Sequence, residues 1–294
     1  MDIRSLGLPF RVGATSYIVP DDLLPNARFL APYVQDMQLV LFEVPSGPSN
    51  LPAAATVQEL AVLGQAQDLT YTVHLLHDLR LADDPLTDVR GAVGGRALSL
   101  ALRKAQQIID LTRPLRPWAW VGHLDGRTVR GDDVPLVQMA DWQDQARAAV
   151  DQVAAWLDRP AQLAIENLEG YPPDFVTPVV MPTAVSRCVD VGHLWLDGQD
   201  PVPPLRTALP RLRVVHLHGI HARDHASLAH MPPAHLDPVL GVLLDARFDG
   251  VVTLEIFGED DFWSSLDALA AAVQRIRGAT IARSTERLVR WNMD

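Results

Sequence analysis

The chain has 294 residues, of which 48% are hydrophobic, and its formal net charge is -11. This length supports one large core, and a (β/α)₈ barrel typically takes about 250 residues. An acidic surface repels a phosphate backbone, so we expect no general nucleic-acid binding. The single cysteine, Cys188, excludes an internal disulfide and a thiolate metal cluster.

The hydropathy pattern predicts neither a secretory leader nor a membrane span. Residues 1–11 lack an apolar segment followed by small residues at a cleavage site. No apolar run approaches the ~18 residues that a bilayer-spanning helix needs. We therefore expect a cytoplasmic protein that does not bind membranes, and we leave its oligomeric state open.

Eight short runs of apolar and β-branched residues recur along the chain, and we interpret each as a buried strand. They cover residues 12–17, 37–43, 70–74, 118–123, 162–166, 186–190, 213–218 and 251–255. Near-continuous apolar runs are typical of a parallel sheet that is buried on both faces. Their spacing matches one strand–helix unit each. The pattern predicts an α/β fold, a (β/α)₈ TIM barrel.

The segments between these strands carry helical periodicity. The clearest cover residues 56–67, 86–111, 136–157, 233–246 and 261–276. Prolines between residues 170 and 183 favour a long loop with at most a short helix, and those at 201–204 begin another helix. We expect residues 1–294 to form one barrel domain, with 278–294 as a C-terminal extension.

Six consecutive predicted strands end on a residue that can bind a metal ion. In chain order these residues are His74, His123, Glu166, Asp190, His216 and Glu255. Barrel strands carry the active site at their carboxyl ends, so we expect these side chains to become neighbours. A salt bridge could explain Glu166 or Glu255 alone, because a buried carboxylate needs a partner. A metal centre explains all six together.

Further candidate ligands lie close to these strand ends. His193 follows Asp190, and Asp224 and His225 lie in the loop after the seventh strand. Glu166 and the ligands that end strands six to eight would satisfy one ion. The remaining histidines, with Glu166 as a bridge, could complete a second and a third site. Zn²⁺, Mn²⁺ and Fe²⁺ all suit mixed carboxylate and imidazole ligands.

Several residues near the same strand ends are candidates for substrate binding. His218 lies on the same side of its strand as His216, so one could bind metal while the other contacts substrate. For Glu43, a substrate contact, a helix cap and a ligand role are all open. Trp195 could contact substrate or serve the structure. Clustered metal ions suit phosphoester cleavage, because they generate hydroxide and neutralise the phosphate.

Some motifs are missing from the sequence. It has no GxGxxG, no P-loop and no G-x-S-x-G elbow. Readings as a dinucleotide-binding, nucleotide-hydrolysing or serine-hydrolase protein therefore have no support.

The order of the ligands resembles the endonuclease IV-like superfamily of xylose isomerase-like barrels, over residues 70 to 256. The matching residues are His74, His123, Glu166, Asp190, His193, His216, Asp224, His225 and Glu255. The resemblance implies a first metal ion held by the two strand-end histidines and Glu166. The loop of that superfamily reads Asp-x-His, whereas Asp224 and His225 are adjacent here.

Short sequence segments across the chain are also similar to those of the cobamide remodeling phosphodiesterases of the CbiR type. They lie at residues 13–18, 22–26, 39–43, 70–74, 165–168 and 223–228. This resemblance implies hydrolysis of the phosphoribosyl bond in the nucleotide loop of a cobamide, a corrinoid substrate. The products would be cobinamide phosphate and an α-ribazole-type nucleoside. On the same basis we place Tyr17 at the substrate.

The predicted catalytic residues are Glu166, Glu255 and His123, and the base could be Glu255 or a metal-bound water. The first alternative is a Mn-dependent sugar isomerase or epimerase with a single ion at Glu166, Asp190, His216 and Glu255. An AP-site endonuclease is a second, which the acidity disfavours, and a non-catalytic corrinoid- or metal-binding barrel is a third. Metal stoichiometry separates the isomerase from the phosphodiesterase.

Overall fold

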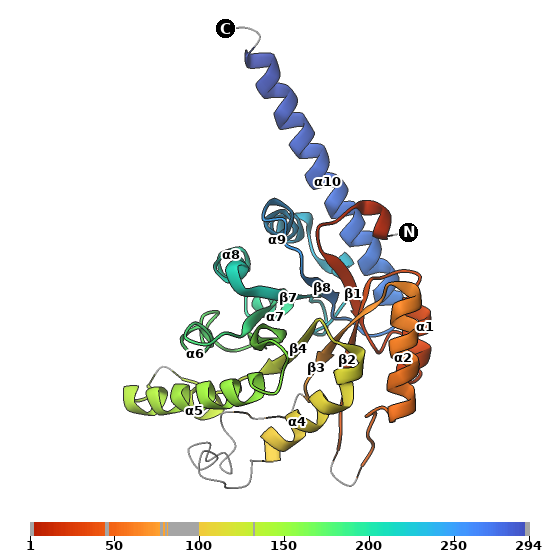
Figure 1. Ribbon diagram of the computed structural model, residues 1–294. Helices are drawn as coiled ribbons and strands as arrows, with labels where there is room; N and C mark the ends of the chain where they lie inside the picture. Colours follow the sequence, from red (N-terminus) through yellow and green to blue (C-terminus); the bar gives the residue numbers. More distant parts are fainter. Residues whose placement is uncertain are drawn as a thin grey trace.

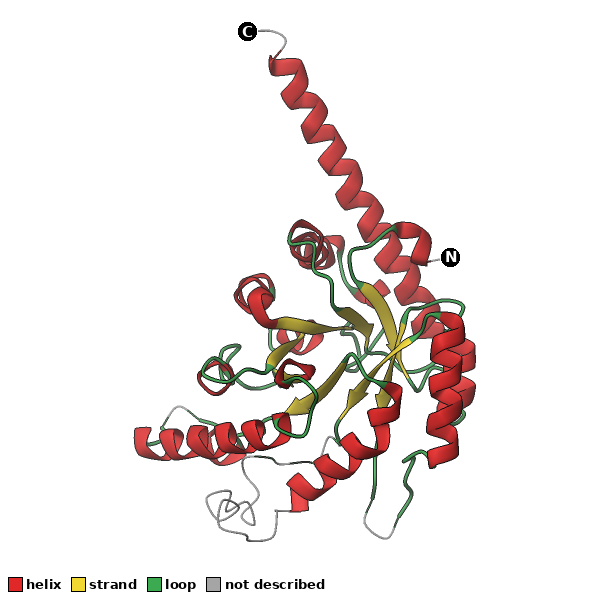
Figure 2. Cartoon of the chain, in the orientation of Figure 1, coloured by secondary structure: helices red, strands yellow, loops and turns green. Residues whose placement is uncertain are grey.

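The structure, a computed structural model, describes residues 3–44, 47–76, 79, 81, 100–131 and 133–291, with side chains up to residue 279. Within these residues eight parallel strands close into a barrel, paired in sequence order from β1 to β8 (Figures 1 and 2). Helices surround the strands on the outside (Figure 2). The predicted (β/α)₈ barrel is confirmed.

Each strand overlaps one of the predicted runs. The strands are β1 (Arg11–Thr15), β2 (Asp36–Val40), β3 (Thr70–His74), β4 (Ala119–His123), β5 (Leu163–Glu166), β6 (Ser186–Asp190), β7 (Leu212–Leu217) and β8 (Val251–Leu254). The second strand ends three residues before the predicted end at 43. There the backbone pairs with residues further along instead: Phe42 N–H donates to Asn50 Oδ1, and Glu43 bridges Ser49.

The described helices follow the strands in turn. They are α1 (Leu23–Leu30), α2 (Ala54–Gln67), α4 (Leu100–Thr112), α5 (Leu136–Ala154), α6 (Thr177–Val180), α7 (Val191–Leu196), α8 (Val202–Ala208), α9 (Pro233–Asp245) and α10 (Glu259–Trp291). The helix predicted over 86–111 is described from residue 100, and its first part lies outside the described residues. The short helix between 170 and 183 and the helix that begins at the second proline group are both present.

Two helices were not predicted, α1 and α7. Pro25 lies in the first turn of α1, where its missing N–H costs no hydrogen bond. The buried side chain of Asn26 fixes the preceding turn, because its Oδ1 accepts from the N–H groups of Ile18 and Val19. Helix α7 begins directly after β6, where the Asp190 side chain accepts from the His193 N–H as a helix cap.

Small apolar side chains fill the barrel directly below the predicted ligands. Because side chains alternate along a strand, the residue two positions before each inward-facing ligand also faces inward. In four neighbouring strands these residues are Val121, Ala164, Cys188 and Val214, which pack together. They form an apolar floor on which the polar layer above them rests.

Helix α10 extends well past the barrel, as Figure 1 shows, so that residues 278–291 continue it outward. None of the described helices combines the length and the apolar composition that crossing a membrane requires.

Candidate metal centre

The residues predicted as metal ligands all lie at the carboxyl end of the barrel, within short distances of one another. They form three groups, called here the inner, middle and outer groups. The inner group consists of Glu166, Asp190, His216 and Glu255. The middle group consists of His74, His123 and Glu166. The outer group contains His193, Asp224 and His225.

The inner group offers a compact set of donor atoms. His216 Nδ1 lies 3.1 Å from Glu255 Oε2, 3.3 Å from Glu166 Oε1 and 3.7 Å from Asp190 Oδ2. His216 Nδ1, Asp190 Oδ2 and Glu255 Oε2 are buried without a hydrogen-bond partner among the described residues. Such atoms are rare and costly in folded proteins. A divalent cation would satisfy them together, so the donor set fits a metal ion.

Gln38 of β2 orients two of these ligands. Its amide nitrogen donates to Glu255 Oε1 at 3.2 Å, because a carboxylate can only accept. Its amide oxygen therefore faces His216 and accepts from Nε2 at 2.8 Å. With an ion bound, His216 would carry its proton on Nε2 and present a lone pair at Nδ1, toward the donor set. Contacts of this kind fix the ring and tautomer of metal-binding histidines.

The middle group is joined to the inner group through Glu166. The Nε2 atoms of His74 and His123 each lie 3.2 Å from Glu166 Oε2. His74 Nδ1 donates to the Leu75 carbonyl at 2.6 Å, so Nε2, which contacts Glu166, would be the atom that binds an ion. One carboxylate oxygen of Glu166 thus faces the histidines and the other faces His216. This geometry is compatible with a bridging role, which stays a prediction for Glu166.

The outer group is built from α7 and the loop after β7. His193 Nδ1 donates to the Asn167 carbonyl, so Nε2 faces Asp224 Oδ2 at 3.9 Å. His225 Nε2 lies 3.5 Å from the same oxygen. His225 has a positive φ of 49°. This turn of the backbone lets the adjacent residues Asp224 and His225 line one cavity, which an extended chain would not.

His218 lies between the inner and outer groups. It is fully buried, and its Nε2 lies 3.2 Å from Asp190 Oδ1 with no hydrogen bond formed. Its ring rests against Gly192, where any side chain would overlap it. Together with His193 and His225 it forms a further group that could hold an ion. The sequence predicts His216 as the ligand of β7 and His218 as a substrate contact, and that role of His218 stays a prediction.

Opposite charges in the centre stabilise one another. Burial alone would raise the pKa of Glu166, but His216 and His123 outweigh it and hold that pKa well below its usual range. Burial likewise favours neutral His193, but Asp190 and Glu166 raise its pKa to about 9. In the metal-free centre His193 therefore favours its protonated form, and a metal ion bound there would displace the proton.

A cavity of about 460 Å³ opens over the centre. Besides ligands, its lining residues are Asp125, Arg127, Arg130, Leu168, Glu169 and Tyr171. These come from the loops after β4 and β5 and were not predicted, because no periodicity marks loop residues. The nearest signal in the sequence is that each loop directly follows a strand that ends on a ligand.

All four residues predicted at the substrate, His218 among them, lie outside the described lining of this cavity. Glu43 pairs with Lys104 at 3.3 Å. The Tyr17 hydroxyl accepts from Asn50 Nδ2 at 2.9 Å. Trp195 is buried and lines a second cavity, between α7 and α9. Their roles in substrate binding stay predictions.

Comparisons with known proteins define the family. Residues 37–279 match the model of the xylose isomerase-like TIM barrel, so the chain belongs to this family. A D-tagatose 3-epimerase-like protein superimposes with a TM-score of 0.72 at 14% identity, covering 92% of this chain and 100% of that one. No curated protein matches the sequence.

Two further solved structures superimpose with similar coverage. The 3-keto-D-glucoside 4-epimerase from E. coli has a TM-score of 0.65 at 13% identity, with 90% of this chain and 98% of that chain covered. The probable 3-DHS dehydratase from Bacillus anthracis has a TM-score of 0.59 at 14% identity, with the same coverage. At such identities these likenesses show the fold alone.

Proposed function

We propose that the protein is a metal-dependent phosphodiesterase that hydrolyses the phosphoribosyl bond in the nucleotide loop of cobamides. The observation that supports this most is the size of the donor set. The inner group alone suffices for one ion, yet His74 and His123 converge on the far oxygen of Glu166. Two or more ions held together favour phosphoester chemistry over a single-ion reaction. The cobamide itself rests on the sequence resemblance.

The ions would be Zn²⁺, Mn²⁺ or Fe²⁺, held by the inner and middle groups and, for a third, by the outer group. When bound, divalent ions lower the pKa of water and neutralise charge on a phosphate.

The protein side chains then have separate tasks. Glu255 lines the cavity, and its Oε2 would either hold the inner ion or accept a proton from the attacking water. The water oxygen forms a bond to phosphorus and releases a proton, the bond between phosphorus and the ribose oxygen breaks, and the ribose oxygen takes up that proton. His123 is the more exposed histidine of the middle group, at 12%, and reaches the cavity wall. Glu166 belongs to both groups and would fix the position of the inner ion relative to the middle one.

A sugar epimerase with one Mn²⁺ ion is the second candidate. The similar solved structures favour it, since they include several ketose 3-epimerases. The inner group would hold the single ion, with Glu166 and Glu255 to move protons. The middle-group histidines are then surplus to the chemistry, which is why we place this candidate second.

The test is to incubate the metal-loaded protein with cobalamin and pseudocobalamin and to separate the products by chromatography and mass. We expect cobinamide phosphate plus nucleoside, lost when a chelator is added. A parallel incubation with D-tagatose and D-fructose tests the second candidate. Epimerised sugar with intact cobamide would overturn the proposal in favour of the epimerase.

A further inference from the structure

Two arginines form one wall of the cavity over the metal centre. Arg127 and Arg130 lie in and after the short turn η3 (Arg127–Val129) that follows β4, and both line the cavity. The wall also includes residues of the loop after β5, where Gly170 and Tyr171 lie. We call Asp125, Arg127, Arg130 and Tyr171 the arginine wall.

Hydrogen bonds to Asp125 lock the two loops together. The Tyr171 hydroxyl donates to Asp125 Oδ1 at 2.8 Å, and Arg127 Nη2 donates to Asp125 Oδ2 at 2.7 Å. The charge of Arg127 is therefore balanced by Asp125 within the wall. The wall is a fixed surface of the cavity, because both loops leave adjacent strands of the barrel.

Arg130 is held in place but keeps its charge available. Its guanidinium lies 4.9 Å from the centre of the Tyr171 ring, a cation–π contact. It also rests on Gly170, where a Cβ would overlap it and where φ is +72°. The side chain is exposed, and it forms no ion pair with any described residue. Within the part of the chain that the structure describes, stacking thus orients the cation without neutralising it.

An oriented, unneutralised arginine beside a metal centre has a specific use. Its planar fork matches the two oxygens of a phosphate, and arginine is favoured where such bidentate recognition matters. The other charged groups of the lining are carboxylates or candidate metal ligands, apart from the paired Arg127. A neutral ketose could accept hydrogen bonds from this cation but carries no negative charge to complement it.

We infer that Arg130 binds the phosphate of the substrate, so that this cavity selects phosphate esters over neutral sugars. The inference rests on the proposed function, and it adds which part of the substrate this wall contacts: the phosphate next to the ions. The phosphate would lie between the ions and Arg130, with Tyr171 and Gly170 as positioning residues for the guanidinium.

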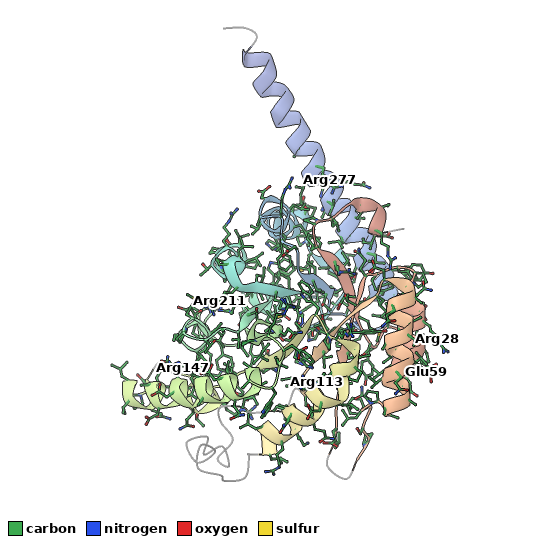
Figure 3. The ribbon with its side chains drawn as sticks, viewed as in Figure 1. Arg28, Glu59, Arg113, Arg147, Arg211 and Arg277 are labelled. Atoms are coloured by element: carbon green, nitrogen blue, oxygen red, sulfur yellow. The ribbon has the colours of Figure 1, made fainter. Side chains whose placement is uncertain are left out.

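Inorganic phosphate is the probe. Its affinity for the Mn²⁺-loaded protein is measured by calorimetry in the wild type, Arg130→Gln, Arg130→Lys and a matched control, Arg28→Gln. Arg28 is an exposed arginine that pairs with Glu59 on the outer face of α1 and α2 (Figure 3). We expect Arg130→Gln to bind phosphate about tenfold more weakly or worse, since a hydrogen bond to a charged group is lost. Arg130→Lys should keep more of the affinity, and Arg28→Gln all of it.

Phosphate affinity unchanged in Arg130→Gln, with metal content and circular dichroism also unchanged, would overturn the inference. Cobamide cleavage by the same variants separates it from the proposed function. Phosphate binding that depends on Arg130 in a protein that cleaves no cobamide would sink the proposed function and leave this inference standing. Cobamide cleavage with an unaltered KM in Arg130→Gln would support the proposed function and overturn this inference.

Discussion

The inner and outer groups of ligands are built differently. The inner ligands end barrel strands, expose 4% or less of their side chains and are oriented by Gln38 from a further strand. The outer group relies on a loop, in which the Asp224 and His225 side chains are 30% and 26% exposed. Strands preorganise a site more firmly than a loop does. We therefore expect the inner group to bind its ion first and more tightly.

Removing the residue shared by the inner and middle groups should have the largest effect. Glu166→Gln replaces the charged bridge by a neutral amide, so metal-dependent turnover should fall by roughly 10³-fold or more. The barrel should stay folded by circular dichroism, and metal content should drop. The surface variant Glu59→Gln is the control. Full turnover in Glu166→Gln would remove Glu166 from the centre.

The support of the inner group can be tested through Gln38. Gln38→Leu leaves the buried His216 Nε2–H and Glu255 Oε1 without their partner. Loss of a hydrogen bond that orients a metal ligand typically costs about 10–100-fold in metal affinity. Competition with a chromophoric chelator measures it, with the exposed Gln65→Leu as control. An affinity equal to the wild type would mean that the strands alone hold these ligands.

The pH dependence follows from His193, whose pKa is raised to about 9 in the metal-free protein. The folded pKa exceeds the unfolded value of about 6.5, so the bound proton stabilises the metal-free fold below pH 6.5. That stabilisation is lost as the pH rises through 9, whereas metal affinity increases, by at most about tenfold per pH unit for each displaced proton. The metal-free Tm should fall between pH 6.5 and 9 by scanning fluorimetry. A rising Tm would contradict the assignment.

The smallest effect is expected at the outer group. Asp224→Asn weakens one exposed ligand, so turnover should fall by about tenfold or less, and metal loss should be confined to the most weakly bound ion. Stepwise dialysis with metal analysis measures this. A loss as large as that of Glu166→Gln would show that the groups form one inseparable site.

The convergence of the candidate ligands could be predicted from the sequence because the strand ends of a parallel barrel must lie together. His74, Asp190 and Glu255 follow apolar runs, and the fold brings such residues together whatever their separation. Gln38 was missed, although a polar residue inside a buried apolar strand must find a partner. That rule, applied to the second strand, would have pointed to it.

The loop residues could not be predicted in the same way. Arg130 and Tyr171 meet only because two loops adopt particular conformations, and neither loop carries a periodic pattern. The sequence also does not show that the adjacent side chains of Asp224 and His225 line the same cavity, since this depends on the left-handed backbone of His225. Strand geometry is fixed by pairing, whereas loop geometry depends on many individual contacts.

The number of ions per chain tests the central claim most directly. The protein is purified, loaded in turn with Zn²⁺, Mn²⁺ and Fe²⁺, dialysed and analysed for metal by mass spectrometry. We expect two or more ions per chain, falling to at most one in Glu166→Gln. A single ion per chain with every metal, unchanged when more is supplied, would contradict the multi-metal centre and favour the epimerase.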